Sequence, residues 1–258
     1  MYSYAFLSDI GLVRSRNEDS VIIVDFPDSA EKDSLVFILA DGMGGHKGGQ
    51  EAAVTFTNTV TVEIQKEKIS LFGLPKRIEL LKEWFLKSAK AIYNFGQRNN
   101  LAGLGTTGVI GCFYKNNFTG GWIGDSRIYV YHDTLQFLTK DHTLIQKQID
   151  RGELQIEDAW QHPSSHILDR CLGLSPSIKE PDICTFQLEP GDVVMSCSDG
   201  LHDVIPHKEI ESIFQDFKKQ KNGKISSLAE LLVKAARALG GPDNVSVALV
   251  RYDGSNEI

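Results

Sequence analysis

The stretch Leu35-Val-Phe-Ile-Leu-Ala-Asp-Gly-Met-Gly-Gly-His46 passes from six consecutive apolar residues directly into an acidic residue and glycines. The apolar run predicts a short strand that is buried on both of its faces. Asp41 then stands at the end of this strand, where the glycines beside it let the backbone approach a ligand closely. Cation and phosphate sites are often built in this way, although a tight turn with a solvated aspartate accounts for the same residues.

Other acidic residues stand at or beside the ends of predicted strands in the same manner. Together with the first one they make a set of five: Glu18, Asp41, Asp125, Asp199 and Asp243. Each one alone is compatible with an ordinary loop or turn, because Asp, Gly and Ser favour such positions. If the strands pack as two sheets, however, the strand ends that carry these acids can converge at one edge of the molecule.

A cleft that holds several carboxylates requires cations, because the acids cannot all stay ionised side by side without them. Carboxylate oxygens select the hard ions Mg²⁺, Mn²⁺ and Ca²⁺, while the lack of paired Cys and His ligands argues against zinc. Two such ions bridged by one carboxylate would lower the pKa of a shared water and make it a nucleophile. Arg14 and Arg16 lie in a segment that is otherwise typical of a solvated loop, and an arginine there would hold a phosphate. The pattern therefore predicts metal-assisted phosphoester hydrolysis.

The rest of the chain predicts helices and strands that would frame such a site. Helices are expected over residues 50–66, 76–97 and 227–239 and after Pro206, each with an apolar stripe that covers a sheet. The stripe of the second helix contains Ile78, Leu81, Phe85, Ile92 and Phe95, with Trp84 beside it. Closely spaced strands predict an antiparallel meander. They cover residues 108–114, 118–123, 127–132 and 135–138.

The segment Gly103-Leu-Gly-Thr-Thr-Gly108 matches the glycine pattern of dinucleotide-binding turns, GxGxxG. That pattern cradles a pyrophosphate only when a strand precedes it and a helix follows it. Here a predicted helix precedes the segment and a predicted strand follows it. We therefore expect no nucleotide at this position.

Composition and charge exclude several classes of function. The chain has 258 residues, of which 41% are hydrophobic and 24% charged, as in ordinary soluble globular proteins. A formal net charge of −7 and a pI near 5.5 argue against general affinity for nucleic acids or anionic membranes. No apolar segment is long enough to span a bilayer, and the first residues do not resemble an export signal. The four cysteines form no CxxC pair, so we expect a cytoplasmic protein with reduced thiols.

Seven short segments span nearly the whole chain in a characteristic order. They are Asp9-Ile-Gly-Leu-Val-Arg-Ser-Arg-Asn-Glu-Asp19, Ala40-Asp-Gly-Met-Gly-Gly-His46, Gly105-Thr-Thr107, Gly124-Asp-Ser-Arg127, Thr139-Lys-Asp-His142, Ser198-Asp-Gly-Leu201 and Gly241-Pro-Asp-Asn244. In this order they resemble the metal-dependent protein Ser/Thr phosphatases of the type-2C (PPM) family, in its short bacterial form. Any one segment is a weak signal, but seven in the family's order are highly specific.

The resemblance implies an α+β fold, a four-layer αββα sandwich of two mainly antiparallel sheets flanked by helices. A single catalytic domain would then cover residues 1–258. The family's flap, which varies and influences substrate choice, would correspond to about residues 143–168. The later part of that region, residues 152–168, lacks periodicity and reads as a mobile lobe near the site, so we interpret His162 and His166 as loop histidines.

The resemblance also assigns ligands to two metal ions. Asp41 would bridge the two ions. Asp199 and Asp243 would complete the coordination of one ion, and Glu18 with the carbonyl group of Gly42 would complete that of the other.

Further roles follow from the same resemblance. Asp19 would lie close by and hold metal-bound water, and Arg14 would bind the substrate phosphate. Asp125 would join Asp199 in holding a weaker third metal that bacterial members contain. Animal members also carry a histidine that is proposed as the general acid for the leaving group. We do not transfer this role to His46, so the leaving-group acid stays open, with a metal-bound water as the candidate.

The implied activity is hydrolysis of phosphoserine and phosphothreonine by a water that bridges two Mg²⁺ or Mn²⁺ ions. The expected partners are phosphorylated proteins, the substrates of a Ser/Thr kinase, with no nucleic acid and no membrane, and the chain is expected to be a monomer. Two alternatives stay open at this stage. One is an inactive pseudophosphatase that binds phosphoproteins, which the complete set of acidic ligands argues against. The other is a phosphoesterase that acts on a small-molecule phosphate.

Overall fold

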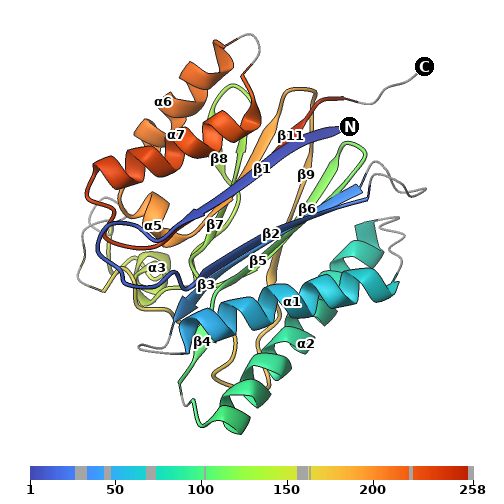
Figure 1. Cartoon of the computed structure of the whole chain (residues 1–258), viewed down its shortest axis with the longest axis vertical. Coiled ribbons are helices and arrows are strands. Elements are labelled where there is room, and N and C mark those ends of the chain that lie inside the picture. Colours follow the sequence, from blue (N-terminus) through green and yellow to red (C-terminus); the bar gives the residue numbers. More distant parts are fainter. Residues whose placement is uncertain are drawn as a thin grey trace.

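The computed structural model describes residues 1–26, 34–43, 48–67, 74–101, 103–155, 162, 164–220 and 223–254. Two β-sheets face each other in the middle of the molecule, and helices cover the outer face of each sheet (Figure 1). The predicted four-layer α+β sandwich is confirmed. No helix among the residues just given is both long and apolar enough to cross a membrane.

Both sheets are antiparallel throughout. In spatial order the first sheet contains β1 (Tyr2–Asp9), β11 (Val245–Tyr252), β10 (Val193–Cys197), β7 (Arg127–Tyr131) and β8 (Leu135–Phe137). The second contains β2 (Asp19–Asp25), β3 (Ser34–Met43), β5 (Gly108–Tyr114), β6 (Asn117–Ile123) and β9 (Asp182–Gln187), with the short β4 (Gly105–Thr106) beside the end of β3. The first strand of the chain thus pairs with the last, which brings the two termini together at one end (Figure 1).

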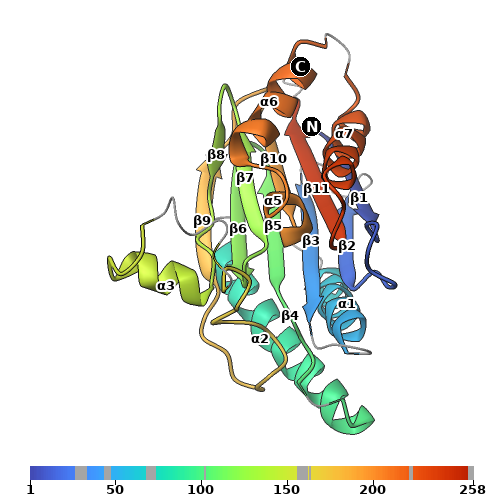
Figure 2. The same cartoon turned by 90° about the vertical axis from the view of Figure 1, so that its left-hand side faces the viewer.

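Four long helices cover the sheets. They are α1 (Gly49–Glu67) and α2 (Leu74–Asn99) on the second sheet, and α6 (His207–Lys218) and α7 (Ile225–Ala238) on the first. Two short helices, α3 (Leu144–Asp150) and α5 (Asp199–His202), lie in the connections. In the side view α3 stands outside the layers, in the region that the sequence assigns to the flap (Figure 2).

The apolar run at residues 35–40 is buried on both faces, as its composition predicts, because β3 lies inside its sheet between two layers of core. Alternate side chains point in opposite directions along a strand. Phe37 therefore packs between the two sheets, where its ring lies 5.7 Å from that of Phe113. Ile38 packs on the other side, against α1 and α2. This strand links two of the three apolar clusters of the fold.

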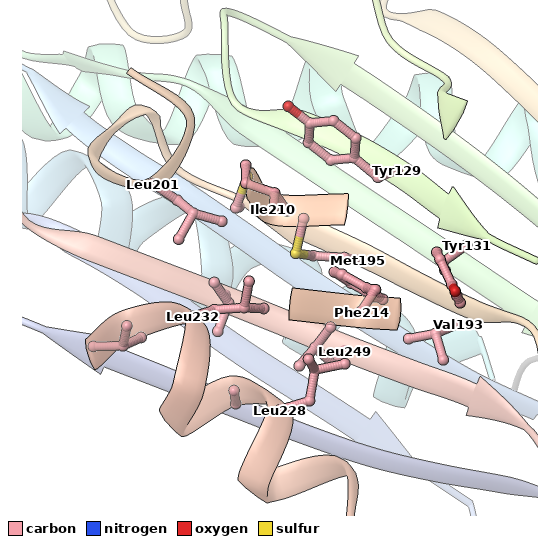
Figure 3. Close-up of a cluster of buried hydrophobic side chains, with 14 of the residues drawn as sticks. Tyr129, Tyr131, Val193, Met195, Leu201, Ile210, Phe214, Leu228, Leu232 and Leu249 are labelled. Carbon is pink, nitrogen blue, oxygen red and sulfur yellow. The ribbon is translucent and has the colours of Figure 1, made fainter. Parts of the chain in front are cut away.

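The helices cover the sheets through the predicted stripes, with one difference. Trp84, which the sequence places beside the stripe of α2, is fully buried, whereas Ile78 and Phe95 at its edges are only half-buried. On the other face, Phe214 of α6 and Leu228 of α7 pack onto Met195 and Leu249 of the first sheet (Figure 3). The stripe of α2 is therefore rotated from the predicted one, towards the broad indole.

The predicted single meander is wrong. β5 and β6 pair in the second sheet, whereas β7 and β8 belong to the first, so the chain changes sheets between Ile123 and Arg127. Gly124 makes this turn with a φ of 108°, which favours glycine. A side chain there would also meet Thr107, since a Cβ atom would lie 2.6 Å from its Cγ2. Local strand spacing cannot reveal such a change, because both arrangements need only a short turn.

The packing between the sheets makes a stability prediction. Phe118 is almost fully buried there, with its ring 4.9 Å from that of Phe113. Phe118→Ala should lower the free energy of unfolding by about 3–5 kcal/mol, because the variant loses apolar contacts and leaves a cavity. Urea unfolding followed by fluorescence measures this change. Phe6→Ala, at a half-exposed position of the edge strand β1, is the control and should cost much less; equal losses in both variants would contradict the prediction.

Candidate metal centre

One cavity of about 940 Å³ gathers most of the predicted site residues at the strand ends opposite the chain termini. Its lining includes Arg14, Glu18, Asp41, Gly42, Asp199 and Asp243. These residues come from the loop before β2, the end of β3, the start of α5 and the turn before β11. Segments more than 200 residues apart in the sequence therefore meet in one pocket.

The backbone of Asp41 is held on both sides by two threonines. The N–H group of Asp41 donates to Thr107 Oγ1 at 2.9 Å, and its carbonyl accepts from the N–H of Thr107 at 2.9 Å and from Thr106 Oγ1 at 2.8 Å. Thr107 Oγ1 is in turn 2.7 Å from Ser126 Oγ. The GxGxxG-like segment thus pairs β4 with β3 and is followed by strand β5, which is the strand that the sequence predicts after it.

Glycines allow the backbone to close tightly around this aspartate. A Cβ atom on Gly42 would lie 2.2 Å from the carbonyl oxygen of Gly49, and one on Gly49 would lie 2.8 Å from Glu18 Oε2. The carboxylate of Glu18 therefore lies against the first residue of α1, a 19-residue helix whose N-terminus favours negative charge. The Gly42 carbonyl and the Glu18 carboxylate, both predicted ligands, lie in the same small region.

Asp199 follows β10 directly and begins α5. The next residue, Gly200, packs against the turn before β11, since a Cβ atom there would lie 1.9 Å from the carbonyl oxygen of Asn244. This close approach brings the turn that carries Asp243 to the start of α5. The Asp-Gly pairs at 41–42 and 199–200 thus have the same physical cause. In each pair the backbone after the aspartate packs so closely against another segment that only glycine fits.

Asp41 and Asp199 come into direct contact. Burial raises the pKa of both carboxyl groups well above the usual range, and neighbouring acids raise it further, including Asp125 for each of them. The charge of Asp199 is one cause of the shift at Asp41, so the two carboxyl groups lie close together. Neither forms an ion pair with a Lys or Arg of the described segments. Their negative charges are therefore uncompensated, and divalent cations would bind between them.

The lining of the whole cavity also contains more acidic than basic residues. Five acids face it, namely Glu18, Asp41, Asp199, Asp203 and Asp243, against two arginines, Arg14 and Arg16. The side chains do not by themselves form a closed cage, since no three Asp, Glu, His or Cys groups within the described ranges are arranged around one point as a metal site. The excess of hard oxygen donors nevertheless fits Mg²⁺ or Mn²⁺ and not a soft ion.

Asp19 lies behind Asp41 and lines a separate cavity of about 530 Å³. The two residues are direct partners across β2 and β3. Oδ2 of Asp19 accepts a hydrogen bond from Ser198 Oγ at 2.8 Å, while its buried Oδ1 has no partner. Burial raises the pKa of Asp19 to about 6, although hydrogen bonds from serines oppose this shift. An unpartnered buried oxygen fits an acceptor for an ordered water.

Arg14 projects into the cavity from the loop before β2. Its Nη2 donates to Asp243 Oδ2 at 2.7 Å, yet 53% of its side chain stays exposed. The hydrogen bond that Arg14 donates to Asp243 raises the pKa of the guanidinium, and the charges of Asp199 and Glu18 act in the same direction. An exposed guanidinium next to the acidic cluster is available to a phosphate.

The structure does not place Asp125 in the lining of this cavity. Asp125 is buried at the turn between the sheets, and burial raises its pKa to about 7, with further increases from Asp141 and Asp203. Its carbonyl oxygen lies 3.1 Å from His202 Nε2. It affects the pKa of both Asp41 and Asp199, so it lies close behind the main cluster.

The sequence reading missed three residues. Asn244 accepts from the N–H of Glu18 at 2.8 Å and donates to the carbonyls of Ile10 and Arg16, so it holds the loop of Glu18 against β11. Asn244 lies in the last of the seven family segments, and this position could have indicated its role. Asp203 lines the cavity four residues after Asp199. Burial opposes its ionisation, but His202, whose Nδ1 lies 3.0 Å from Asp203 Oδ1, keeps its pKa below the usual value.

The third of these residues is His166. It lines the cavity as well, although the sequence predicts only an exposed loop histidine in a lobe near the site. His46, to which we transferred no role, lies outside the described residues.

An acid-rich pocket with an exposed arginine has the composition of a divalent-metal phosphoesterase site, and comparisons with known proteins agree. A family model described as Protein phosphatase 2C matches residues 15–235. The serine/threonine phosphatase stp of Listeria welshimeri is 32% identical over 95% of this chain and 94% of its own length. By these matches, the chain belongs to the protein phosphatase 2C family.

Two solved structures share the fold. The S. agalactiae serine/threonine phosphatase superposes with a TM-score of 0.87 at 28% identity, covering 98% of this chain and all of that one, 100%. The catalytic domain of the serine/threonine protein phosphatase PstP, solved in complex with two manganese ions, superposes with a TM-score of 0.79 at 30% identity and covers 97% of each chain. Dependence on a divalent metal is thus a property of the family to which this chain belongs.

The raised carboxyl pKa values predict how metal-free stability depends on pH. Since the folded state holds the protons of Asp19 and Asp125 up to about pH 6 and 7, against ordinary values of 3.8, their contribution is present at low pH. It is lost as the pH rises through those values, so the free energy of unfolding in EDTA should fall between about pH 5 and pH 8. Urea unfolding at both pH values measures it. Asp125→Asn should reduce this fall, and exposed Asp216→Asn should leave it unchanged.

Equal pH dependence in wild type and Asp125→Asn would contradict this account of the buried acids. Added Mn²⁺ gives a second measurement. It should raise the melting temperature more at the higher pH, where the carboxylates are ionised and free to bind it.

Proposed function

We propose that the chain hydrolyses phosphoserine and phosphothreonine in proteins, using divalent ions held by the acids of the 940 Å³ cavity. The contact between Asp41 and Asp199, two carboxyl groups with no basic partner, carries this proposal. Two ionised carboxyl groups held this close repel each other, and a cation bound between them removes the repulsion. Family membership supports the reaction, since two relatives that match 95% of this chain are named a serine/threonine phosphatase and a protein phosphatase.

Two ions, Mn²⁺ or Mg²⁺, would occupy the core of the site. Asp41 would be shared by both ions, Asp199 and Asp243 would hold one, and Glu18 with the Gly42 carbonyl would hold the other. The two manganese ions of the PstP catalytic domain support this number. When bound, the ions lower the pKa of a water and neutralise phosphate charge.

The protein groups around the ions orient the reactants. Arg14 binds the oxygens of the substrate phosphate, which requires that its guanidinium leave Asp243 or share it. Asp19 accepts a hydrogen bond from an ordered water through its unpartnered Oδ1 and so orients that water. A third, weaker cation would lie between Asp199, Asp125 and Asp203, since the charge of Asp125 raises the pKa of Asp199 and the charge of Asp203 raises the pKa of both.

Phosphorylated proteins, the products of a Ser/Thr kinase, are the proposed substrates, and the chain acts as a cytoplasmic monomer. We propose a single catalytic domain over residues 1–258, with the flap at about 143–168. His166, at the cavity wall, brings this flap to the entrance of the site. The bridge between Thr143 and Leu168 joins the two ends of the flap, and Lys147 in the flap forms an ion pair with Asp169 directly after it.

Removal of a core ligand tests the metal site directly. Asp199→Ala or Asp41→Ala should lower Mn²⁺-dependent hydrolysis of p-nitrophenyl phosphate by more than about 100-fold, since loss of even an outer partner of a ligand costs 10–100-fold. Calorimetric titration should show weaker Mn²⁺ binding, and EDTA should abolish wild-type activity. The metal-free variants should melt no lower than wild type, because each has lost one of two repelling acids. Wild-type activity in either variant would refute the proposal.

Arg14→Ala tests the phosphate site. It should raise KM for a phosphothreonine peptide by about tenfold, because a charged hydrogen bond of about 1.5–3 kcal/mol is lost from the bound substrate. Arg98→Ala, an exposed position on α2, serves as the matched control. A fall in kcat with unchanged KM would show that Arg14 acts in another step.

The two alternative functions differ in the same assays. A pseudophosphatase would bind phosphopeptides without turnover, which the complete set of acids at 18, 41, 199 and 243 argues against. A small-molecule phosphoesterase would prefer p-nitrophenyl phosphate to peptides. Comparison of kcat/KM for the two substrates separates these activities.

A further inference from the structure

A second cavity, of about 780 Å³, lies at the opposite end of the first sheet from the metal centre. It opens between the ends of β1, β11, β10 and β7 on one side and the end of α6 with the start of α7 on the other. None of the residues that line it also lines the metal cavity. Its volume is in the range of small-molecule sites.

The floor of this cavity is one row of side chains across four strands. Ser3 pairs with Arg251, Arg251 with Val193, and Val193 with Tyr131. Because side chains alternate along strands, the row faces the same side of the sheet as the row two residues further in. That inner row consists of Ala5, Leu249, Met195 and Tyr129, and it belongs to the apolar cluster under α6 and α7 (Figure 3).

The outer row differs from the inner one in chemistry. Where the helices cover the sheet, the row is apolar apart from one phenol; where the cavity opens, it offers a serine, an arginine and a second phenol. Phe214 and Phe217 of α6 and Ile225 of α7 supply an apolar wall beside it. The cavity therefore combines a flat apolar side with several polar groups, as ligand sites do.

Tyr131 provides the observation that points to a ligand. It is only 4% exposed, and its ring packs on that of Phe214 at 5.1 Å. Its hydroxyl has no hydrogen-bond partner among the described residues, although Tyr131 lines the cavity. In Figure 3 this hydroxyl lies beside Val193, the next residue of the row. The hydroxyl oxygen is not among the fully buried atoms without a partner, so it is accessible from the cavity and can donate to a ligand there.

Basic groups surround this donor in a chain whose net charge is −7. Lys218, Lys224 and Arg251 all line the cavity. Lys218 pairs with Asp133 at 2.9 Å and Arg251 with Asp253 at 2.7 Å, but Lys224 has no ion pair with a described residue. One positive charge therefore stays uncompensated.

Lys224 is also the N-cap residue of α7, and no side chain caps this 14-residue helix. The N–H groups of its first turn favour an anion. The uncapped helix start, the unpaired Lys224 and the free Tyr131 hydroxyl lie around the same cavity. Their chemistry is complementary to a negative group next to an aromatic or acyl body.

We propose that this cavity binds a small amphipathic anion, with a flat apolar body and one phosphate or carboxylate group. The apolar body lies against Phe214 and Phe217, and the anionic group receives the Tyr131 hydroxyl and the Lys224 ammonium. The proposal does not depend on the phosphatase reaction, because the two cavities share no residue.

The probe for this site is 8-anilinonaphthalene-1-sulfonate, whose fluorescence rises in apolar surroundings, titrated into the full chain in EDTA. Lys224→Gln should raise its Kd about fivefold, the effect of losing one partly exposed ion pair. Tyr131→Phe, which removes only the hydroxyl, should do the same. Lys234→Gln removes an equal charge from the exposed side of α7 and should leave Kd unchanged, as should Asp41→Ala in the metal centre.

A neutral probe isolates the role of charge. N-phenyl-1-naphthylamine has the same rings without the sulfonate, so its Kd should not respond to Lys224→Gln. Equal effects of Lys224→Gln and Lys234→Gln on the sulfonate, or none from either Lys224→Gln or Tyr131→Phe, would overturn the proposal. So would a neutral probe that responds to Lys224→Gln as strongly as the sulfonate.

Competition identifies the anionic group. Phenylphosphonate or phenylacetate should displace the sulfonate probe, and the stronger competitor tells phosphate from carboxylate chemistry. Benzyl alcohol should not displace it. Equal displacement by all three compounds would show an apolar pocket without anion recognition and would contradict the assignment.

Discussion

The repulsion between carboxylates crowded into one cavity is the constraint on which the rest of the site depends. Asp41 and Asp199 come into contact although burial and neighbouring acids oppose ionisation of both. Side chains on mobile loops would separate to relieve this strain. Here they cannot, because Thr106 and Thr107 hold the backbone of Asp41 and the packing of Gly200 holds that of Asp199. The fold thus holds the acids close together, and a divalent ion bound between them would relieve their repulsion.

The two-sheet architecture supplies the rigidity that this arrangement needs. β3 brings Asp41 to the edge of one sheet, while β10 and β11 bring Asp199 and Asp243 to the same edge of the other. Hydrogen bonds cross between the sheets at this edge, from Ser198 to Asp19 and from Glu18 to Asn244. The apolar layer between the sheets fixes their separation, so packing far from the site sets the distances within it.

Much of this could be predicted from the chain itself, and the failures have identifiable causes. Apolar periodicity located the helices and strands because each element buries one face or, for β3, two. The prediction of a single meander was wrong because the spacing between strands indicates only that the turn is short. It does not indicate to which sheet the next strand belongs. The helical period places Trp84 at the edge of the apolar stripe of α2, but the residue is fully buried. Its broad indole is large enough to reach the core from that position. Asn244 acts through its side-chain amide on backbone groups, which leaves no periodic signal.

The sequence by itself determined which residue types stand at the strand ends, because an acid followed by glycine is a local property of the chain. It also determined the family, through seven short segments in order. Only the tertiary structure decided which acids face the cavity: it brought Asp203 and His166 into the lining and left Asp125 behind it. It alone revealed the outer row of Ser3, Arg251, Val193 and Tyr131. The reason is that strand register and the reach of covering helices arise from long-range packing, which no local pattern encodes.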